Sequence, residues 1–174
     1  MENIYHQYWE QELQYSFIAE DRCKKRAYVC SPLSAETEKD FIENMRVARA
    51  YMFYALKKMN MSASAPHAYL PMLLCDKVPA ERAIALDIGL RLLEQSEVLL
   101  VCGNRLSSGM KGEISRAVEL RMEIIVFDEG LYLDVKKLVT QKGGEKGTVK
   151  LDRENFPMGF TSPTTYLENA AMFK

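Results

Sequence analysis

The residue of this sequence best placed to do chemistry is Glu113, which follows a polar loop, residues 103–112. Before the loop comes a short apolar run, Val98–Cys102, whose β-branched and aliphatic residues are typical of a buried strand. After Glu113 come a helical pattern and a second apolar run, Ile124–Phe127. Strand, loop, helix and strand form a βαβ unit, whose ligands bind at the carboxyl ends of the strands. A carboxylate at that edge can be a nucleophile that divides a group transfer into two displacements.

Two structural roles for Glu113 follow from its place in the first turns of the expected helix. A carboxylate there interacts favourably with the helix macrodipole, which stabilises a helix by about 0.3–1 kcal/mol. Arg116 lies three residues further along the same face, so the two side chains can form an ion pair. The macrodipole also favours the ionised carboxylate that a nucleophile needs. The spacing alone therefore leaves a catalytic and a structural role open.

The composition argues against several classes of function. The chain has 174 residues, of which 48% are hydrophobic, and a net charge of −1, which does not favour a nucleic-acid or membrane partner. No apolar run approaches the roughly 18 residues that a membrane span needs, and no signal peptide is evident at the N-terminus. The four cysteines are scattered without a CxxC pair. We therefore expect a cytoplasmic protein without a metal, a cofactor or disulfides.

The elements that position Glu113 alternate between strands and helices. The apolar patterns predict strands at residues 26–30, 62–67, 98–102 and 124–127, and helices at 37–59, 79–95, from about 113 and at 131–139. This alternation predicts a parallel α/β sheet, and right-handed crossovers give an order near 2-1-3-4, with a fifth strand to be sought after Val135. The switch point then lies between strands 1 and 3, and it faces Ser31 on one side and Asn104–Glu113 on the other.

The ends of the chain differ from this unit. Residues 1–25 are rich in aromatic side chains and predict a helical extension that packs on the domain, on a second subunit or on another partner. We assign residues 26–140 to the central domain and residues 141–174 to a linker and C-terminal tail, because the latter contain paired glycines and scattered prolines. The loop at residues 68–78 is apolar, which is typical of a lid or a subunit contact.

Five separated motifs of the chain occur in an order that resembles a known group of proteins. They are Tyr28–Leu33, Asn44–Arg49, Ala65–His67, Pro79–Arg82 with Asp87–Leu90, and Cys102–Ile114. These motifs resemble an uncharacterised phage and bacterial family that is similar to the nucleoside 2-deoxyribosyltransferases. The resemblance covers about residues 26–128. It implies a flavodoxin-like three-layer sandwich with four or five parallel strands, order near 2-1-3-4(-5), and a homo-oligomer in which one subunit completes its neighbour's site.

The resemblance also implies an activity. In the transferases a glutamate attacks the anomeric carbon of deoxyribose and expels the base, and a second base or water then takes the sugar. This role falls on Glu113, and the partner is a small nucleoside or nucleotide. The transferases protonate the leaving base with acidic residues, whereas the loop here offers Asn104 and no aspartate. The alternative acid is His67, which titrates near neutral pH or else is a structural histidine that caps the Tyr69 loop.

Residues of the first strand are the next candidates for the site. Tyr28 lies close to the position of an active-site tyrosine in the transferases. Ser31, in the Ser31-Pro32 turn, contacts a sugar or phosphate or else bonds its own backbone. These side chains would form the half of the site that faces Glu113.

The start of the helix that carries Glu113 supplies the last candidates. Ser107, Ser108 and the amides of Gly109 to Lys111 can hold a sugar hydroxyl or a 5′-phosphate, and Met110 lines the pocket or the core. The leading hypothesis is transfer or hydrolysis at the N-glycosidic bond of a nucleoside or deoxynucleotide. The alternatives are a non-catalytic nucleotide-binding or sensing module of a phage or mobile element, and an interaction protein that uses its terminal segments.

Overall fold

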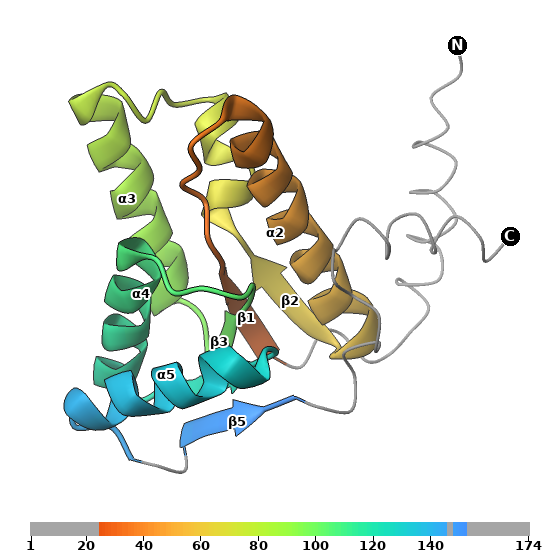
Figure 1. The fold of residues 1–174 in the computed structure, drawn as a ribbon, viewed down its shortest axis with the longest axis vertical. Helices are drawn as coiled ribbons and strands as arrows, with labels where there is room; N and C mark the ends of the chain where they lie inside the picture. The colour runs from red at the N-terminus through yellow and green to blue at the C-terminus, as the bar shows by residue number, and fades with distance from the viewer. Residues whose placement is uncertain (1–24, 146–147, 153–174) are drawn as a thin grey trace, which may run out of the picture.

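Five parallel strands form one sheet in the computed structural model, which describes residues 25–145 and 148–152 (Figure 1). In chain order they are β1 (Lys25–Cys30), β2 (Met61–Ser64), β3 (Val98–Val101), β4 (Glu123–Val126) and β5 (Val149–Leu151). The order across the sheet is β2-β1-β3-β4-β5. In register, Tyr28 of β1 pairs with Ser64 of β2 and with Leu99 of β3. The flavodoxin-like α/β fold and its strand order are thus confirmed.

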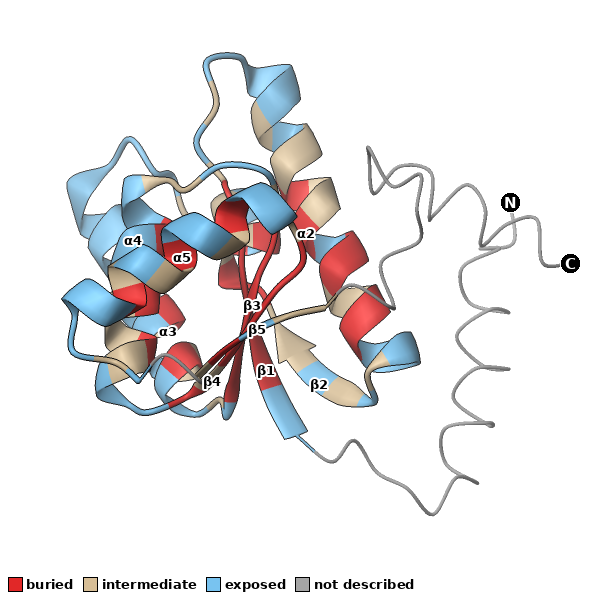
Figure 2. Ribbon diagram, turned by 60° about the horizontal axis from the view of Figure 1, so that its bottom comes forward, coloured by how far each residue is buried: buried red, intermediate tan, exposed pale blue. Residues whose placement is uncertain are grey.

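Helices cover both faces of the sheet. They are α2 (Glu38–Lys58), α3 (Pro79–Glu94), α4 (Ser108–Glu119) and α5 (Glu129–Gln141). Successive strand residues point to opposite faces. Ala27 and Val29 of β1 therefore pack in the cluster that includes α2, whereas Tyr28 and Cys30 pack in the cluster that includes α3, α4 and α5. Figure 2 shows β3, most of β4 and the second half of β1 as the buried centre of the three layers, whereas β2 at the edge of the sheet is intermediate or exposed.

Three of the helices begin at a side-chain cap that the sequence makes recognisable. The side chain of Thr37 accepts a hydrogen bond from the amide of Asp40 at the start of α2. Ser107 does the same for Met110 in α4, and Asp128 caps α5. Such caps satisfy amides that have no partner inside the helix and contribute about 1 kcal/mol each.

The segment after β2 differs from its prediction. The predicted strand reached residue 67, but β2 ends at Ser64 and a 3₁₀ helix, η1 (Pro66–Ala68), follows. Pro66 has no N–H to donate to the sheet, which explains why the ladder stops before it. A second 3₁₀ helix, η2 (Leu70–Met72), continues the apolar loop. Met72, the last residue of η2, is 75% exposed, and the idea that this loop is a lid or a subunit contact stays a prediction.

The sheet extends beyond the domain boundary expected at residue 140. Helix α5 ends at Gln141, and β5 pairs with β4 inside the segment assigned to a linker and tail. The physical reason is that a short strand with one apolar inward residue, Val149, carries little periodic signal. Residues 1–24 and 153–174, and with them the predicted N-terminal extension and most of the tail, lie outside the described residues.

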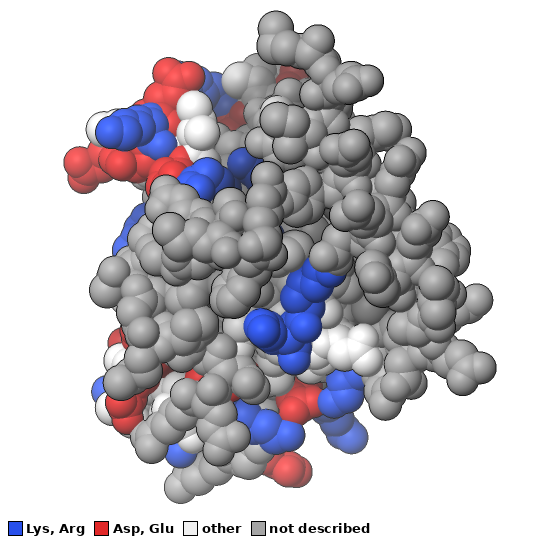
Figure 3. Space-filling model, turned by 90° about the vertical axis from the view of Figure 1, so that its right-hand side faces the viewer, with Lys and Arg blue, Asp and Glu red and all other residues white. Residues whose placement is uncertain are grey.

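The described residues have no long apolar helix, and the charges on the face described below are mixed. None of their helices combines the length and the hydropathy that crossing a bilayer demands. On the face shown in Figure 3, acidic and basic side chains occur together at both its upper and lower ends. Such mixing matches the net charge of −1.

Candidate functional site

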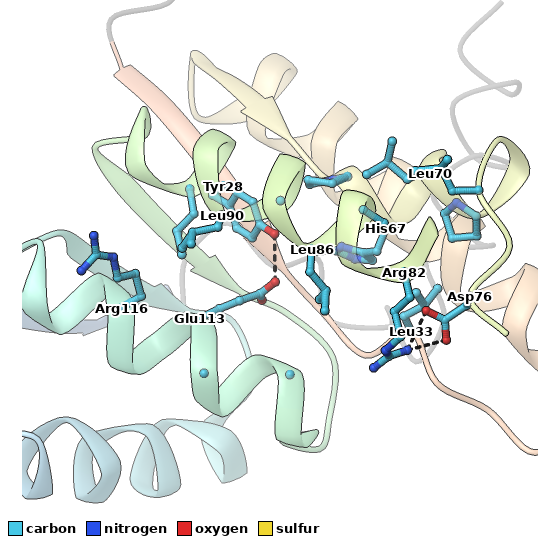
Figure 4. A pocket seen from close by; sticks show the side chains of 18 residues that line it. Tyr28, Leu33, His67, Leu70, Asp76, Arg82, Leu86, Leu90, Glu113 and Arg116 are labelled. Carbon is cyan, nitrogen blue, oxygen red and sulfur yellow. Dashed lines mark hydrogen bonds and ion pairs between the residues drawn. The ribbon is translucent and has the colours of Figure 1, made fainter. Parts of the chain in front are cut away.

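A cleft of about 300 Å³ opens at the carboxyl edge of the sheet, between α3, α4 and the two 3₁₀ helices (Figure 4). Its walls are mainly apolar side chains of α3 and of the segment from η1 to η2, among them Leu70, Leu86 and Leu90. Its polar groups come from Tyr28, His67, Asp76, Arg82, Glu113 and Arg116. A volume near 300 Å³ lies at the lower end of the range typical of small-molecule sites.

Glu113 is held in this cleft by Tyr28. The Tyr28 hydroxyl donates a hydrogen bond of 2.8 Å to Glu113 Oε1, which Figure 4 shows as a dashed line between β1 and α4. Tyr28 itself is buried, and Gly89 of α3 lies beside its hydroxyl, where an added Cβ would come within 3.5 Å. The carboxylate is thus oriented by a rigid ring that the core holds in place.

The protonation of Glu113 is governed by burial rather than by the helix end. Glu113 is the sixth residue of α4, so it lies beyond the first turn, where the macrodipole acts. Burial raises the pKa of the Glu113 carboxyl, and hydrogen bonds from Cys30 and Tyr28 oppose this rise without cancelling it. The expectation that the helix end favours ionisation is therefore wrong for this residue.

The ion pair expected between Glu113 and Arg116 does not form. Arg116 instead donates to Glu94 of α3 at 2.6 Å and to Glu119 at 2.7 Å. These partners turn the guanidinium away from the carboxylate that precedes it by one helical turn. Glu113 is left with neutral donors, which removes the simplest structural explanation for its position.

His67 lies in the same cleft, but its protonation state differs from the one expected from the sequence. Its Nε2 is 2.7 Å from Oγ of Ser31, which is buried at the end of β1. Burial lowers the pKa of His67 to about 4, so the ring is neutral at neutral pH. The expectation that His67 titrates near neutral pH is therefore wrong, and its role as the acid that protonates the leaving base stays a prediction.

The cleft includes only part of the residue set predicted from the sequence. Tyr28, His67, Gly109 and Glu113 line it, and Ser31 reaches it through His67. The other predicted residues do not line it: Pro32, Asn104, Ser107, Ser108 and Met110.

Each of these remaining residues has another place in the structure. The Ser107 hydroxyl caps α4, and Met110 is buried in the core, which settles the choice between pocket and core for that side chain. Asn104 and Ser108 are exposed. Pro32 is buried against Gly103, whose positive φ of 92° and lack of a Cβ allow the β3 loop to pass close to it.

Several cleft residues were missed by the sequence reasoning. Asp76 and Arg82 form an ion pair of 2.6 Å at one side of the cleft. Gly112 lies one residue before Glu113, and an added Cβ there would meet nothing within 4 Å. Their position in the chain could have indicated them. The segment after the second strand of a parallel sheet lies at the same edge as the loops after the first and third strands.

Comparison with known proteins identifies a family. Residues 25–127, more than half of the chain, match a domain of unknown function, DUF7768. The chain belongs to this family. All the cleft residues named above lie within the DUF7768 domain. No curated protein matches the chain. The resemblance of this DUF7768 domain to nucleoside 2-deoxyribosyltransferases therefore stays a prediction.

Proposed function

We propose that the protein cleaves the N-glycosidic bond of a nucleoside, with Glu113 as the nucleophile. The observation that carries this proposal is the Tyr28–Glu113 hydrogen bond inside the apolar cleft. When it is ionised, a carboxylate that is held by a neutral donor and not by a cation is not neutralised by an ion pair, so it can attack an electrophilic carbon. The resemblance to the deoxyribosyltransferases assigns the same role to this residue.

The reaction is a double displacement at the anomeric carbon. A Glu113 carboxylate oxygen forms a bond to C1′ as the C1′–N bond breaks, and the bonding electron pair leaves with the base. The base takes up one proton from solvent, and the sugar stays attached to Glu113 as an ester. Water or a second base then attacks C1′ from the opposite face and frees the carboxylate. Water gives hydrolysis, whereas a second base gives transfer.

The charges of the cleft favour an uncharged nucleoside over a 5′-phosphate. Among the described residues, each cation that lines the cleft is paired with a carboxylate, Arg82 with Asp76 and Arg116 with Glu94 and Glu119. The serines that suggested a phosphate site lie outside the cleft lining. A phosphate would therefore have to displace an existing ion pair, whereas the apolar walls can pack directly on a base or a deoxyribose ring.

The test is release of free base, followed by chromatography, from a panel of deoxynucleosides, ribonucleosides and deoxynucleoside 5′-monophosphates. We expect release from nucleosides, a loss of at least about 1,000-fold in Glu113→Gln, and little change in Glu123→Gln. Glu123 is a suitable control because it is a partly exposed carboxylate whose partners are Lys25 and Lys150. Intact mass under single-turnover conditions should show one added deoxyribosyl group. No release from any substrate, or full activity in Glu113→Gln, would refute the proposal.

A binding module is the second candidate, and one observation favours it. Besides Tyr28 and Glu113, the cleft has two groups of a type that can protonate a leaving base, and these are a neutral histidine and an aspartate held by Arg82. Thermal unfolding with the same panel separates the candidates. Stabilisation by a nucleoside that is not cleaved identifies a sensor, whereas base release that depends on Glu113 identifies the enzyme.

A further inference from the structure

The Ser31–His67 pair joins the segments that follow the neighbouring strands β1 and β2 at the carboxyl edge of the sheet. Ser31 follows the last residue of β1, and His67 is the middle residue of η1, after β2. The 2.7 Å separation of Ser31 Oγ and His67 Nε2 is that of a good hydrogen bond. His67 lines the cleft, whereas Ser31 lies behind it in the core.

The direction of this hydrogen bond follows from what else is available to Ser31. A serine hydroxyl has one proton to donate, and a buried donor without an acceptor costs about 1–3 kcal/mol. Within the described residues, His67 Nε2 is the one acceptor that Ser31 Oγ meets. Ser31 therefore donates to Nε2, and a neutral ring that accepts at Nε2 must carry its proton on Nδ1.

The Nδ1–H group remains free to meet a ligand. No hydrogen bond joins His67 Nδ1 to any described residue, and no fully buried side-chain nitrogen or oxygen of the described residues lacks a partner. Nδ1 is therefore accessible, and the cleft is the space that the ring borders. Figure 4 draws His67 between the Tyr28–Glu113 pair and the Asp76–Arg82 pair.

We propose that His67 stabilises the departing base by donating a hydrogen bond from Nδ1, and that Ser31 is the positioning residue that fixes this tautomer. The inference rests on the proposed function and specifies its substrate. The base must present an acceptor conjugated with the glycosidic nitrogen, such as O2 of a pyrimidine or N3 of a purine. A neutral histidine that polarises an acceptor has a precedent in triosephosphate isomerase.

The electron balance of the step is complete. As the Glu113–C1′ bond forms and the C1′–N bond breaks, the electron pair spreads from the glycosidic nitrogen to the conjugated acceptor. The Nδ1–H donor stabilises the charge there without transferring its proton, and solvent water then protonates the base. This assigns a role to His67 that does not require an imidazolium, which its low pKa of about 4 excludes at neutral pH.

The first test is independent of activity. The chain contains two histidines, His6 and His67, so nitrogen-15 NMR of histidine-labelled protein gives few signals, and His67→Asn assigns them. At pH 7 we expect His67 of the unmodified full-length protein to carry its proton on Nδ1, and Ser31→Ala to give a mixture of tautomers. A proton on Nε2 or an imidazolium in the unmodified protein would overturn the inference.

The second test compares two leaving groups. Deoxyguanosine loses its base as an anion, whereas N7-methyldeoxyguanosine loses a neutral base that needs no donor. We expect His67→Ala to slow base release from deoxyguanosine, or from whichever ordinary nucleosides the protein cleaves, by roughly 10- to 100-fold. Release from the methylated nucleoside should change by less than about 3-fold. Ser31→Ala should show the same pattern at about 3- to 10-fold, and Ser115→Ala, a serine of α4 that bonds the Lys111 carbonyl, should show neither loss.

The outcomes separate this inference from the proposed function. If the unmodified protein releases base through Glu113 but His67→Ala slows both leaving groups equally, the role of His67 is refuted and the nucleophile stands. If the unmodified protein cleaves neither ordinary nucleosides nor the methylated one, the proposed function fails and this inference fails with it.

Discussion

Glu113 and Glu123 lie at opposite ends of the same sheet and have opposite surroundings. Glu123 begins β4 at the amino edge, where Lys150 and Lys25 each approach it to 2.6 Å, and these bonds lower the pKa of its carboxyl. Glu113 lies at the carboxyl edge, where burial raises the pKa of its carboxyl and its hydrogen-bond donors are neutral. Cations neutralise the first carboxylate and join three strands. Among the described residues, the second accepts hydrogen bonds from neutral donors, so no ion pair neutralises it, and in its ionised form it can act as a nucleophile.

The two ends also differ in how much space they leave. At the amino edge the long side chains of Lys25 and Lys150 pair with Glu123, whereas the face of α4 beside Glu113 carries two glycines, Gly109 and Gly112. An added Cβ at Gly112 would meet no atom within 4 Å. Glycine destabilises a helix by about 1 kcal/mol relative to alanine, so two glycines make α4 less stable than alanines would. The open strip is consistent with a ligand ring that packs on the helix backbone.

After the loss of Glu113 itself, filling this strip should have the largest effect. In Gly112→Leu the side chain enters the cleft next to Glu113, and we expect base release to fall by more than about 100-fold. The midpoint of thermal unfolding should stay the same or rise, because leucine favours the helix and the site is open. The comparison is with Gly112→Ala, which should gain stability and keep more activity. Unchanged activity in the leucine variant would show that the ligand does not occupy this strip.

Removal of the donor to Glu113 should have a smaller effect. Tyr28→Phe keeps the ring in the core but removes the 2.8 Å hydrogen bond to the carboxylate, so the pKa of Glu113 should rise further. We expect kcat/KM for base release to fall roughly 10- to 100-fold, since hydrogen bonds to charged groups are worth about 1.5–3 kcal/mol. The acid limb of the pH–rate profile should move to higher pH.

A second buried tyrosine is the control for this variant. The Tyr51 hydroxyl accepts from the amide of Gly103 at 3.3 Å, away from Glu113. Tyr51→Phe should therefore leave the acid limb where it is. A similar shift of that limb in both variants would mean that the Tyr28 hydroxyl has no specific role in setting the charge of Glu113.

The sequence predicted the frame of the site better than its chemistry. The apolar runs and the helix periodicity are local signals, and they placed Glu113, Tyr28 and His67 at one edge of the sheet. Three features of the site depend on packing between elements that are far apart in the chain. Burial raises the pKa of Glu113 and keeps His67 neutral, and Arg116 pairs with Glu94 of another helix. Asp76 was missed because no recognisable motif surrounds it.

The two carboxylates should also affect stability with opposite signs, and these are the smallest of the expected effects. The raised pKa of Glu113 means that the folded protein loses stability as pH rises from the unfolded pKa through the folded one. Glu113→Gln should therefore be more stable than the unmodified protein at pH 7, and the difference should vanish in acid. The lowered pKa of Glu123 means that its stabilisation is present above the unfolded pKa and is lost as pH falls through the folded one.

Glu123→Gln should accordingly be less stable at pH 7, by up to about 1 kcal/mol because the ion pairs with Lys25 and Lys150 are partly exposed. That deficit should fade in acid, as the pH falls through the lowered pKa of Glu123. Urea unfolding of the three proteins between pH 3 and 8, analysed with a common slope, measures both differences. If both variants changed stability in the same direction at pH 7, the contrast between Glu113 as a candidate nucleophile and Glu123 as a carboxylate that links strands would be wrong. If Glu113→Gln alone departed from expectation and were less stable at pH 7, the Glu113 carboxylate would contribute to stability although its hydrogen-bond donors are neutral.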